Sequence, residues 1–337
     1  MQAYQVETDK GIDAIKKVEV PVPKLKDDEV LVEMKACSLN YRDTLIPLGG
    51  YPRNDTRPVI PLSDGAGIVV EVGKSVSTIK PGDRVTGNFF QDWVTGSVEE
   101  KGLCSALGGG IDGTLAEHFV LKEHGTIFIP ENMSFEAAST LPCAAVTAWQ
   151  ALVSLGNIKA GDTILLLGTG GVSIFGLQFA KAFGANVIIT SSSDEKLARA
   201  KQMGADYLIN YKDNPDWEQD VLDITDGKGV DNVLEVGGVG TFEKSIASAK
   251  VHGIVSMIGV LTGFDAPSIN MTVAFNLLKI HGIYVGSVEM FKEMNTFISK
   301  HNIQPIVDIV YGFDDALKAY QHLAGAKHFG KIVISRS

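Results

Sequence analysis

The sequence predicts an α/β protein in which a barrel-like β domain is followed by a doubly wound parallel sheet. Two observations support this fold class. Short β-like runs separated by Pro, Gly and Asp turns fill the first 125 residues, and strands alternate with helices from about residue 134 onward. Regularly spaced short strands are typical of barrels, whereas helices between apolar strands are typical of parallel sheets. A chain of 337 residues also exceeds the size of most single cores, so we expect two domains.

The strands of the first domain are expected at the runs "EVLVEMKACSL" (29–39), "GAGIVVEVG" (65–73), "DRVTGNF" (83–89) and "EHFVL" (117–121). After them, "SFEAASTLPCAAVTAWQALVSLG" predicts one helix. Ser134 is its expected N-cap, Glu136 lies in its first turn, and Gly156 is expected at its end.

The parallel sheet is expected to begin at the apolar run "TILLLG" (163–168). The helix "VSIFGLQFAKAFG", the strand "NVIITSS", the helix "SDEKLARAKQMG" and the strand "DYLIN" follow in that order. Two more strands, "VDNVLEV" and "GIVSMIG", enclose the helical run "GTFEKSIASAK". Parallel strands joined through helices cross over in the right-handed sense.

The composition argues against several classes of function. The net charge of −10 is spread along the chain without a cluster of Lys or Arg, so nucleic acid is not expected as a partner. Two uncharged stretches, 137–158 and 163–180, are interrupted by Pro or Gly and predict buried elements rather than membrane spans. The N-terminal segment has no apolar signal core, and the three cysteines are widely separated, so we expect a soluble cytoplasmic protein without disulfides.

The run "GTGGVS" (168–173) joins the first parallel strand to its helix and predicts a dinucleotide-binding turn, although Ser173 replaces the third glycine of G-x-G-x-x-G. Gly168 allows the tight turn, and Gly170 allows the backbone to approach a pyrophosphate. Gly171 and Val172 begin the helix, whose free N–H groups and dipole attract anions. The alternative is an ordinary turn between a strand and a helix.

The next strand ends in "TSSSDEK", which favours NADP over NAD. NAD-binding sheets place Asp or Glu near this position, where a carboxylate would repel a 2′-phosphate. Ser191 and Ser192 stand there instead, and Lys196 and Tyr211 are near enough in the sequence to add a charge and a hydroxyl. The alternative is that the serines cap the helix and Lys196 is a surface charge.

Several motifs in register resemble the medium-chain dehydrogenase/reductase superfamily, which contains zinc alcohol dehydrogenases and zinc-free quinone reductases. The resemblance covers nearly all of the chain. It is carried by "NYRD" (40–43), "DGAGIVVEVG" (64–73), "PGDRV" (81–85), "LPCAAVTAWQAL" (141–152), "GTGGVS" (168–173), "GAD" (204–206), "YVGS" (284–287) and "HFGK" (328–331).

The resemblance implies a GroES-like catalytic domain at 1–125, a Rossmann cofactor-binding domain at 126–286 and a return segment at 287–337 that completes the catalytic domain. It also implies further contacts with the cofactor. The matching positions are Tyr41, Thr147, Gly259, Val260, Leu261, Gly286, Ser287 and Lys331. Relatives often carry Arg after the Gly-Ser pair, whereas this chain carries Val288.

The resemblance predicts no metal. Asn40 and Ser63 match the first two zinc ligands of the zinc enzymes, and Asp64 follows the second position. Only Cys143 remains at the third, and one thiolate does not hold zinc without partners. The four-cysteine structural lobe of the zinc branch is also absent, because residues 88–112 contain Cys104 alone. The chain therefore resembles the quinone oxidoreductase branch.

Hydride addition to a quinone or an α,β-unsaturated carbonyl needs less assistance than alcohol oxidation, because conjugation spreads the negative charge onto oxygen. Asn40 is expected to donate a hydrogen bond to that oxygen, and Tyr51 to bind the substrate or deliver a proton. Each has a structural alternative: Asn40 can hold its own loop, and Tyr51 can be a half-buried aromatic residue. Arg42 and Asp43 are expected to pair and brace the loop.

The sequence therefore predicts an NADPH-dependent, zinc-independent reductase of quinones or enones. One alternative is an enoyl-thioester reductase, for which Arg53 and Arg57 are weak candidates to bind a carrier arm. Others are an NADPH-binding protein with a sensing or structural role and a zinc-independent alcohol dehydrogenase. The segment "KIHGIYVGS" (279–287) resembles the family's edge strand that pairs across a two-fold axis, so we expect a homodimer through the Rossmann edge strand.

Overall fold

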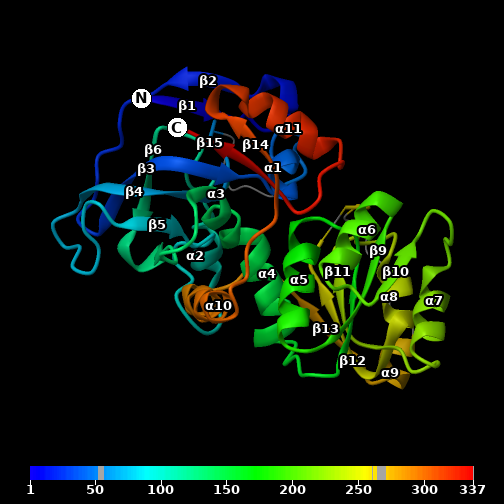
Figure 1. Cartoon of the computed structure of the whole chain (residues 1–337). Helices are drawn as coiled ribbons and strands as arrows, with labels where there is room; N and C mark the ends of the chain where they lie inside the picture. Colours follow the sequence, from blue (N-terminus) through cyan, green and yellow to red (C-terminus); the bar gives the residue numbers. More distant parts are fainter. Residues whose placement is uncertain (52–56, 260, 264–270, 337) are drawn as a thin grey trace. The chain divides into compact units, whose positions relative to one another are not determined.

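The computed structural model describes residues 1–51, 57–259, 261–263 and 271–336. The chain forms two compact units (Figure 1). Unit 1 consists of Met1–Val146 and Val285–Ser337, and unit 2 consists of Thr147–Tyr284. Within the described ranges, no helix is both long enough and apolar enough to cross a membrane.

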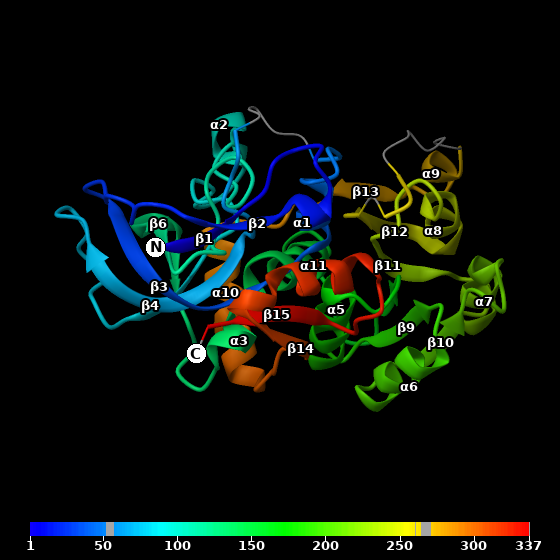
Figure 2. The same cartoon turned by 90° about the horizontal axis from the view of Figure 1, so that it is seen from above.

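Unit 1 is built on a largely antiparallel sheet in the order β14-β15-β3-β4-β5-β7, with β6 also paired to β3. Its long strands β3 and β4 run side by side as curved ribbons (Figure 2). The strands of the sheet are β3 (Glu29–Ser38), β4 (Asp64–Val72), β5 (Arg84–Gly87), β6 (His118–Lys122), β7 (Thr126–Phe128), β14 (Val307–Gly312) and β15 (Lys331–Ser335). Strands β1 (Gln2–Gln5) and β2 (Lys16–Glu19) form a separate pair. The strands predicted in the first 125 residues are confirmed.

The helices of unit 1 are short except for α10 and α11. They are α1 (Tyr41–Leu45), α2 (Glu100–Leu103), α3 (Phe135–Ala138), α10 (Val288–His301) and α11 (Ala316–Ala324), with short turns η1 (Ile12–Ala14), η2 (Glu123–Gly125), η3 (Leu141–Ala145) and η5 (Phe313–Asp315). The core of the unit joins buried residues of β3 and β6, such as Val32 and Phe119, to Tyr320 of α11. The C-terminal segment therefore belongs to the same core as the first strands.

Strand register places three polar residues at one end of this sheet. Strand β15 is antiparallel to β3 with Val333 opposite Ser38, and β4 is antiparallel to β3 with Asp64 opposite the same serine. The pairing continues beyond β3, where the N–H of Leu39 donates to the carbonyl of Ile332. Residue 331 therefore lies beside residue 40, and Asp64 lies close to both.

Unit 2 contains a six-stranded, fully parallel sheet in the order β10-β9-β8-β11-β12-β13. Its strands are β8 (Thr163–Leu166), β9 (Asn186–Ser191), β10 (Tyr207–Asn210), β11 (Val230–Glu235), β12 (Ala249–Met257) and β13 (Lys279–Gly282). Helices flank the sheet (Figure 1). They are α5 (Gly171–Ala182), α6 (Asp194–Gln202), α7 (Trp217–Ile224), α8 (Phe242–Ser248) and α9 (Thr272–Phe275). The predicted doubly wound sheet is confirmed, and its order reverses between β8 and β11.

The single helix predicted over 134–156 is wrong. Ser134 does cap a helix, since its hydroxyl accepts from the Ala137 N–H, but α3 ends at Ala138. Wider π-type turns at Leu141–Ala145 and Gln150–Ser154 surround α4 (Val146–Trp149). Pro142 has no N–H to donate, so it fits a new helical start and not a helix interior.

Candidate active site

Asn40 lies where β3 ends and α1 begins, in an extended backbone conformation. Its backbone N–H donates to Oδ2 of Asp43 at 2.7 Å, and its carbonyl accepts from the Asp43 N–H at 2.9 Å. Asn40 and Asp43 thus stand as a capping box at the start of α1. The Asn40 amide also has a partner outside this helix.

That partner is Lys331, the first residue of β15. Its ammonium donates to Oδ1 of Asn40 at 2.5 Å and to the carbonyl of Leu39 at 2.6 Å. It also lies 3.5 Å from Oδ2 of Asp64. Nδ2 of Asn40 is buried and has no hydrogen-bond partner among the described residues. One end of the amide is therefore fixed by a cation, while the other end presents unused donors.

Asp64 opens β4 and is fully buried. Its Oδ1 accepts from the Ser63 hydroxyl at 2.6 Å, and its Oδ2 accepts from the Ser38 hydroxyl at 3.2 Å. A buried carboxylate is tolerated when hydrogen bonds and a counter-charge surround it, and Lys331 supplies that charge. Asn40, Asp64 and Lys331, together with Ser38 and Ser63, thus form a buried polar cluster. Within it, Asp64 and Lys331 are a partly separated ion pair.

Asp43 forms the second buried ion pair of the cluster. Its Oδ1 lies 3.4 Å from Nε of Arg42, so the predicted bracing pair is confirmed. Burial raises the pKa of the Asp43 carboxyl to about 6, although the Arg42 charge and the Asn40 N–H oppose this rise. Asp43 therefore titrates in a range where an ordinary aspartate is fully ionised.

Tyr51 is half-buried and stacks on Arg42, whose guanidinium carbon lies 4.9 Å from the tyrosine ring centroid. On another side the same carbon lies 4.7 Å from the ring centroid of Phe89. Arg42 also donates through Nη2 to the carbonyl of Leu107 at 2.8 Å. This packing ties Tyr51 through Arg42 and Asp43 to Asn40. The two candidate catalytic residues therefore belong to one connected network.

The glycine turn of unit 2 has the geometry of an anion-binding turn. Gly168 follows β8 with φ at 72°, a value that favours glycine, and Gly170 is the N-cap of α5. A β-carbon at either glycine would meet no atom within 4 Å, so open space lies above the turn. The N–H groups of the first helical residues have no partner inside a helix, and here they belong to Gly171 and Val172. Ser173 is buried and donates to the carbonyl of Leu167 at 2.7 Å, which closes the turn.

The predicted ribose-phosphate residues lie at the carboxyl ends of β9 and β10. Ser191 is buried and its hydroxyl accepts from the N–H of Ser193, while Ser193 caps α6 by accepting from the Lys196 N–H. Tyr211 is exposed, and its N–H donates to the Ser191 carbonyl. Ser193 therefore caps α6, and the two serines predicted to bind the phosphate, Ser191 and Ser192, precede it.

Other predicted cofactor residues are distributed over both units. Thr147 is buried in α4, and Gly259 lies so close to the Val236 backbone that any side chain would clash. Leu261 is half exposed, and Val260 lies outside the described residues. Unit 1 contains the remaining ones. Tyr41 is exposed at the start of α1, the Gly286 carbonyl accepts from the Asn88 amide, and Ser287 caps α10.

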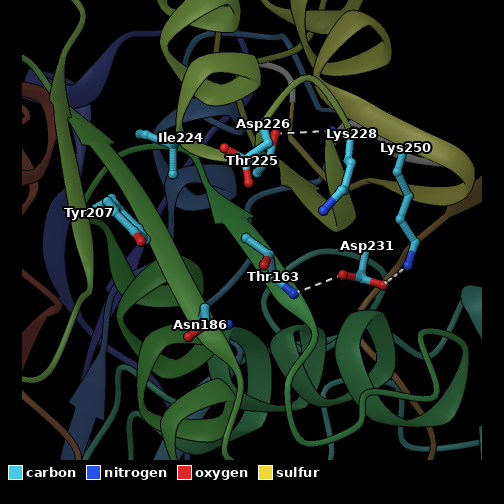
Figure 3. Close-up of a pocket in the computed structure, with 10 residues that line it drawn as sticks. Thr163, Asn186, Tyr207, Ile224, Thr225, Asp226, Lys228, Asp231 and Lys250 are labelled. Carbon is cyan, nitrogen blue, oxygen red and sulfur yellow. Dashed lines mark hydrogen bonds and ion pairs between the residues drawn. The ribbon is translucent and has the colours of Figure 1, made fainter.

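A hollow of about 320 Å³ is present in unit 2 (Figure 3). It lies at the edge of the sheet opposite the glycine turn. Its lining includes Thr163, Asn186 and Tyr207, each the first residue of its strand. In Figure 3, Asp231 pairs with Lys250 and accepts from the Thr163 N–H. Ligands of open parallel sheets bind outside the carboxyl ends of the strands, so this hollow is not a candidate for the active site.

Residues 26–131 match the family model "Alcohol dehydrogenase GroES-like domain", and residues 171–300 match "Zinc-binding dehydrogenase". A zinc-type alcohol dehydrogenase-like protein of Schizosaccharomyces pombe is 46% identical over 332 residues, covering 96% of each chain. The chain belongs to the medium-chain dehydrogenase/reductase superfamily. An NADPH-dependent alkenal/one oxidoreductase of Arabidopsis thaliana is 30% identical, covering 99% of this chain and 79% of that protein.

Within the superfamily the chain is quinone oxidoreductase-like. A quinone oxidoreductase of Pseudomonas syringae pv. tomato superposes with a TM-score of 0.84 at 28% identity and covers 99% of both chains. The GroES-like and Rossmann-like halves expected from the sequence are confirmed by these matches. The chain is therefore an oxidoreductase of this superfamily.

The family contains zinc enzymes, but the residues at the matching positions do not fit zinc. The oxygen of Asn40 is bonded to an ammonium, and the Ser63 hydroxyl donates to Asp64. Within the described ranges, no three His, Cys, Asp or Glu side chains gather as a metal site. Burial raises the pKa of the Cys143 thiol, which disfavours the thiolate that a metal requires. Next to Asn40 and Asp64, the positive charge comes from Lys331.

Glu235 is a buried residue that the sequence reasoning missed. At the end of β11, its carboxylate accepts from the N–H groups of Gly237 and Gly238 and from the hydroxyls of Thr241 and Ser245. It shapes the loop at the carboxyl edge of the sheet, next to the point where the strand order reverses. A lone acid inside the apolar run "VDNVLEV" and directly before two glycines was the available signal.

Proposed function

We propose that this protein is an NADPH-dependent reductase that delivers hydride to a quinone or an α,β-unsaturated carbonyl without a metal. The observation that carries the proposal is the Asn40 amide. Its Nδ2 is a buried donor without a partner among the described residues, at the position where zinc relatives hold their metal. An unpaired buried donor is costly, so such a group is expected to meet an acceptor on a ligand.

The chemistry needs one donor at the substrate oxygen. When bound, the reduced nicotinamide supplies the hydride, which adds to the β-carbon of an enone or to a quinone. Negative charge then grows on the substrate oxygen, where Nδ2 of Asn40 donates a hydrogen bond. A proton from the Tyr51 hydroxyl or from water completes the reduction, so one hydride and one proton are added. A donor held in place for such an oxygen typically accelerates the reaction by about 100- to 1,000-fold.

The cofactor preference is supported by the residues at the ends of β9 and β10. Ser191 and Ser192 carry no charge, so a 2′-phosphate there would meet hydroxyls and no carboxylate. The relative from Arabidopsis thaliana is named as NADPH-dependent. We propose that Lys196 and Tyr211 contribute to the same phosphate site, and that the glycine turn holds the pyrophosphate.

Two further assignments follow the family pattern. We propose that unit 1 carries the catalytic groups and that unit 2 binds the cofactor; the boundaries expected after residues 125 and 286 lie after Val146 and Tyr284 in the structure. We also propose a cytoplasmic homodimer formed through β13, which is the edge strand of the unit 2 sheet. An exposed edge strand is a template for pairing with another chain. Light scattering at micromolar concentration should give twice the monomer mass, and a monomer would contradict the pairing.

The proposal is tested by following nicotinamide absorbance while the purified protein meets NADPH and a panel of acceptors. The panel contains a benzoquinone, a naphthoquinone, a simple enone and an aldehyde, with NADH and a chelator as controls. Oxidation of NADPH by a quinone or the enone that continues in the chelator is the expected result. Turnover of the aldehyde alone, or loss of activity in the chelator, would overturn the proposal.

A further inference from the structure

Lys331 is a buried cation whose ammonium contacts oxygens of the protein. Only 2% of the residue is exposed, and its ammonium lies within reach of three oxygens from Leu39, Asn40 and Asp64. All of these belong to unit 1. A buried ammonium has to be paired and hydrogen-bonded, and this one is. The resemblance had assigned Lys331 to the cofactor, but its donors point at protein oxygens.

The ammonium decides which way the Asn40 amide faces. A lysine has three donors and no acceptor, whereas an asparagine amide has an accepting oxygen at one end and a donating NH₂ at the other. Only Oδ1 can therefore face Lys331, at the observed 2.5 Å. Turning the amide over would bring its NH₂ against the ammonium. Nδ2 is thereby fixed in the direction where no described residue accepts from it.

Asn40 is held at its backbone as well as at its side chain. The Asp43 carboxylate accepts from the Asn40 N–H at 2.7 Å. Lys331 also donates to the backbone carbonyl of the preceding residue, Leu39, at 2.6 Å. Asp64 faces Lys331 from β4 and balances its charge. A charge-assisted hydrogen bond to an amide oxygen also polarises the amide and makes its N–H groups better donors. The cation thus acts on the Asn40 N–H groups through the amide oxygen.

We propose that Lys331 is a positioning residue of the reductase site, which orients and polarises the Asn40 amide so that Nδ2 donates to the substrate carbonyl oxygen. This proposal rests on the proposed function. It assigns to a lysine part of the electrostatic role that the metal has in the zinc branch, with the asparagine amide as the group that reaches the substrate. It also removes Lys331 from the set of residues expected to bind the cofactor.

The test compares Lys331→Met, Lys331→Gln, Asn40→Ala and the double variant Asn40→Ala with Lys331→Met. Affinity for NADPH is measured by fluorescence titration, and kcat is measured at saturating NADPH and acceptor. Lys331→Met should lower kcat about 10- to 100-fold, the usual cost of losing a supporting residue. Its affinity for NADPH should change less than about twofold, because the Lys331 ammonium is taken up by protein oxygens. Lys331→Gln, which keeps an N–H donor, should recover part of the lost kcat.

The double variant decides whether Lys331 acts through Asn40. Since the lysine has no substrate contact of its own, adding Lys331→Met to Asn40→Ala should lower kcat no further. Lys122→Met is the matched control, because Lys122 lies in the same unit and pairs with Asp92 at 2.7 Å. It should leave kcat and NADPH affinity unchanged.

The outcomes separate the two proposals. If the wild-type protein turns over none of the acceptors, the proposed function fails and this inference falls with it. If the wild type is active, three results overturn the inference alone: an unchanged kcat in Lys331→Met, fully additive losses in the double variant, or a defect confined to NADPH affinity. Should Lys331→Met fail to fold by circular dichroism, Lys331→Gln and its combination with Asn40→Ala give the same test.

Discussion

The buried polar cluster of unit 1 and the glycine turn of unit 2 are built in opposite ways. The turn uses backbone groups from consecutive residues, 168–173, and its side chains are small or absent. The cluster uses polar and charged side chains from β3, β4, α1 and β15, and Lys331 reaches residues about 290 positions earlier in the chain. A site built from the backbone of consecutive residues can be predicted from the sequence. A cluster of side chains from distant strands cannot, because its members meet only through the register of those strands.

The largest expected effect belongs to the cluster. Asn40→Ala removes the proposed donor to the substrate oxygen and should lower kcat about 100- to 1,000-fold. Affinity for NADPH should stay the same, because the turn in unit 2 is untouched. Steady-state kinetics with the best quinone or enone measure the first quantity, and fluorescence titration measures the second. Asn186→Ala, at the amino edge of the unit 2 sheet, is the control and should match the wild type.

The second prediction concerns the pH response of the cluster. Asp43 has a pKa of about 6 in the folded protein against an ordinary 3.8, so the protonated form is favoured by folding. Its contribution to stability is complete below about pH 4 and is lost as the pH rises through about 6, at a cost of about 3 kcal/mol. The free energy of unfolding of Asp43→Asn, relative to the wild type, should therefore rise between pH 4 and pH 7.

Urea titrations at several pH values measure that difference. Asparagine can still accept from the Asn40 N–H, so the start of α1 should be retained. A constant difference between the two proteins across the range would show that the Asp43 carboxyl titrates as an ordinary one.

The third prediction moves to the turn. Gly170→Val places a side chain into the open space above it, at a residue whose φ of −79° any amino acid adopts. Affinity for NADPH should fall by about tenfold or more, equal to about 1.4 kcal/mol, because the phosphates lose their close approach. The melting temperature should stay near that of the wild type. Gly312→Val, at an exposed position of unit 1, is the control, and a similar loss of affinity there would contradict the assignment.

The smallest expected effect concerns the choice of cofactor. Ser192→Asp puts a carboxylate where a 2′-phosphate is expected to bind, so the ratio of kcat/KM for NADPH over NADH should fall about tenfold. Ser97→Asp, an exposed serine of unit 1, should leave the ratio unchanged. An unaltered ratio in Ser192→Asp would move the phosphate site away from the end of β9.

The fold was predictable because its signals are local. Apolar runs with glycine stops predicted the strands and helices of unit 2, and Gly184 and Gly204 do follow α5 and α6 with φ of 80° and 101°. The prediction failed around Pro142, where the apolar pattern of a helix continues but the backbone donor is missing. The prediction of one helix followed the apolar periodicity and did not take into account that Pro142 lacks a backbone N–H.

The candidate site was predictable only in part. Asn40 and Tyr51 were named as candidates because motifs of the family mark their positions. The partners of Asn40 were not found, since nothing near residue 40 in the sequence indicates that Lys331 and Asp64 face it. Glu235 was missed for a related reason, because its four donors become apparent only when the loop after β11 is folded.

Unit 1 is assembled from two stretches of chain that flank unit 2 in the sequence. During synthesis, domains tend to fold as they emerge, starting from the N-terminus. The strands of unit 2 are synthesised before β15, so Asp64 has no counter-ion from Lys331 until the final strand is made. Under the proposed function, the cofactor-binding unit is therefore made before Lys331, the last member of the Asn40 site.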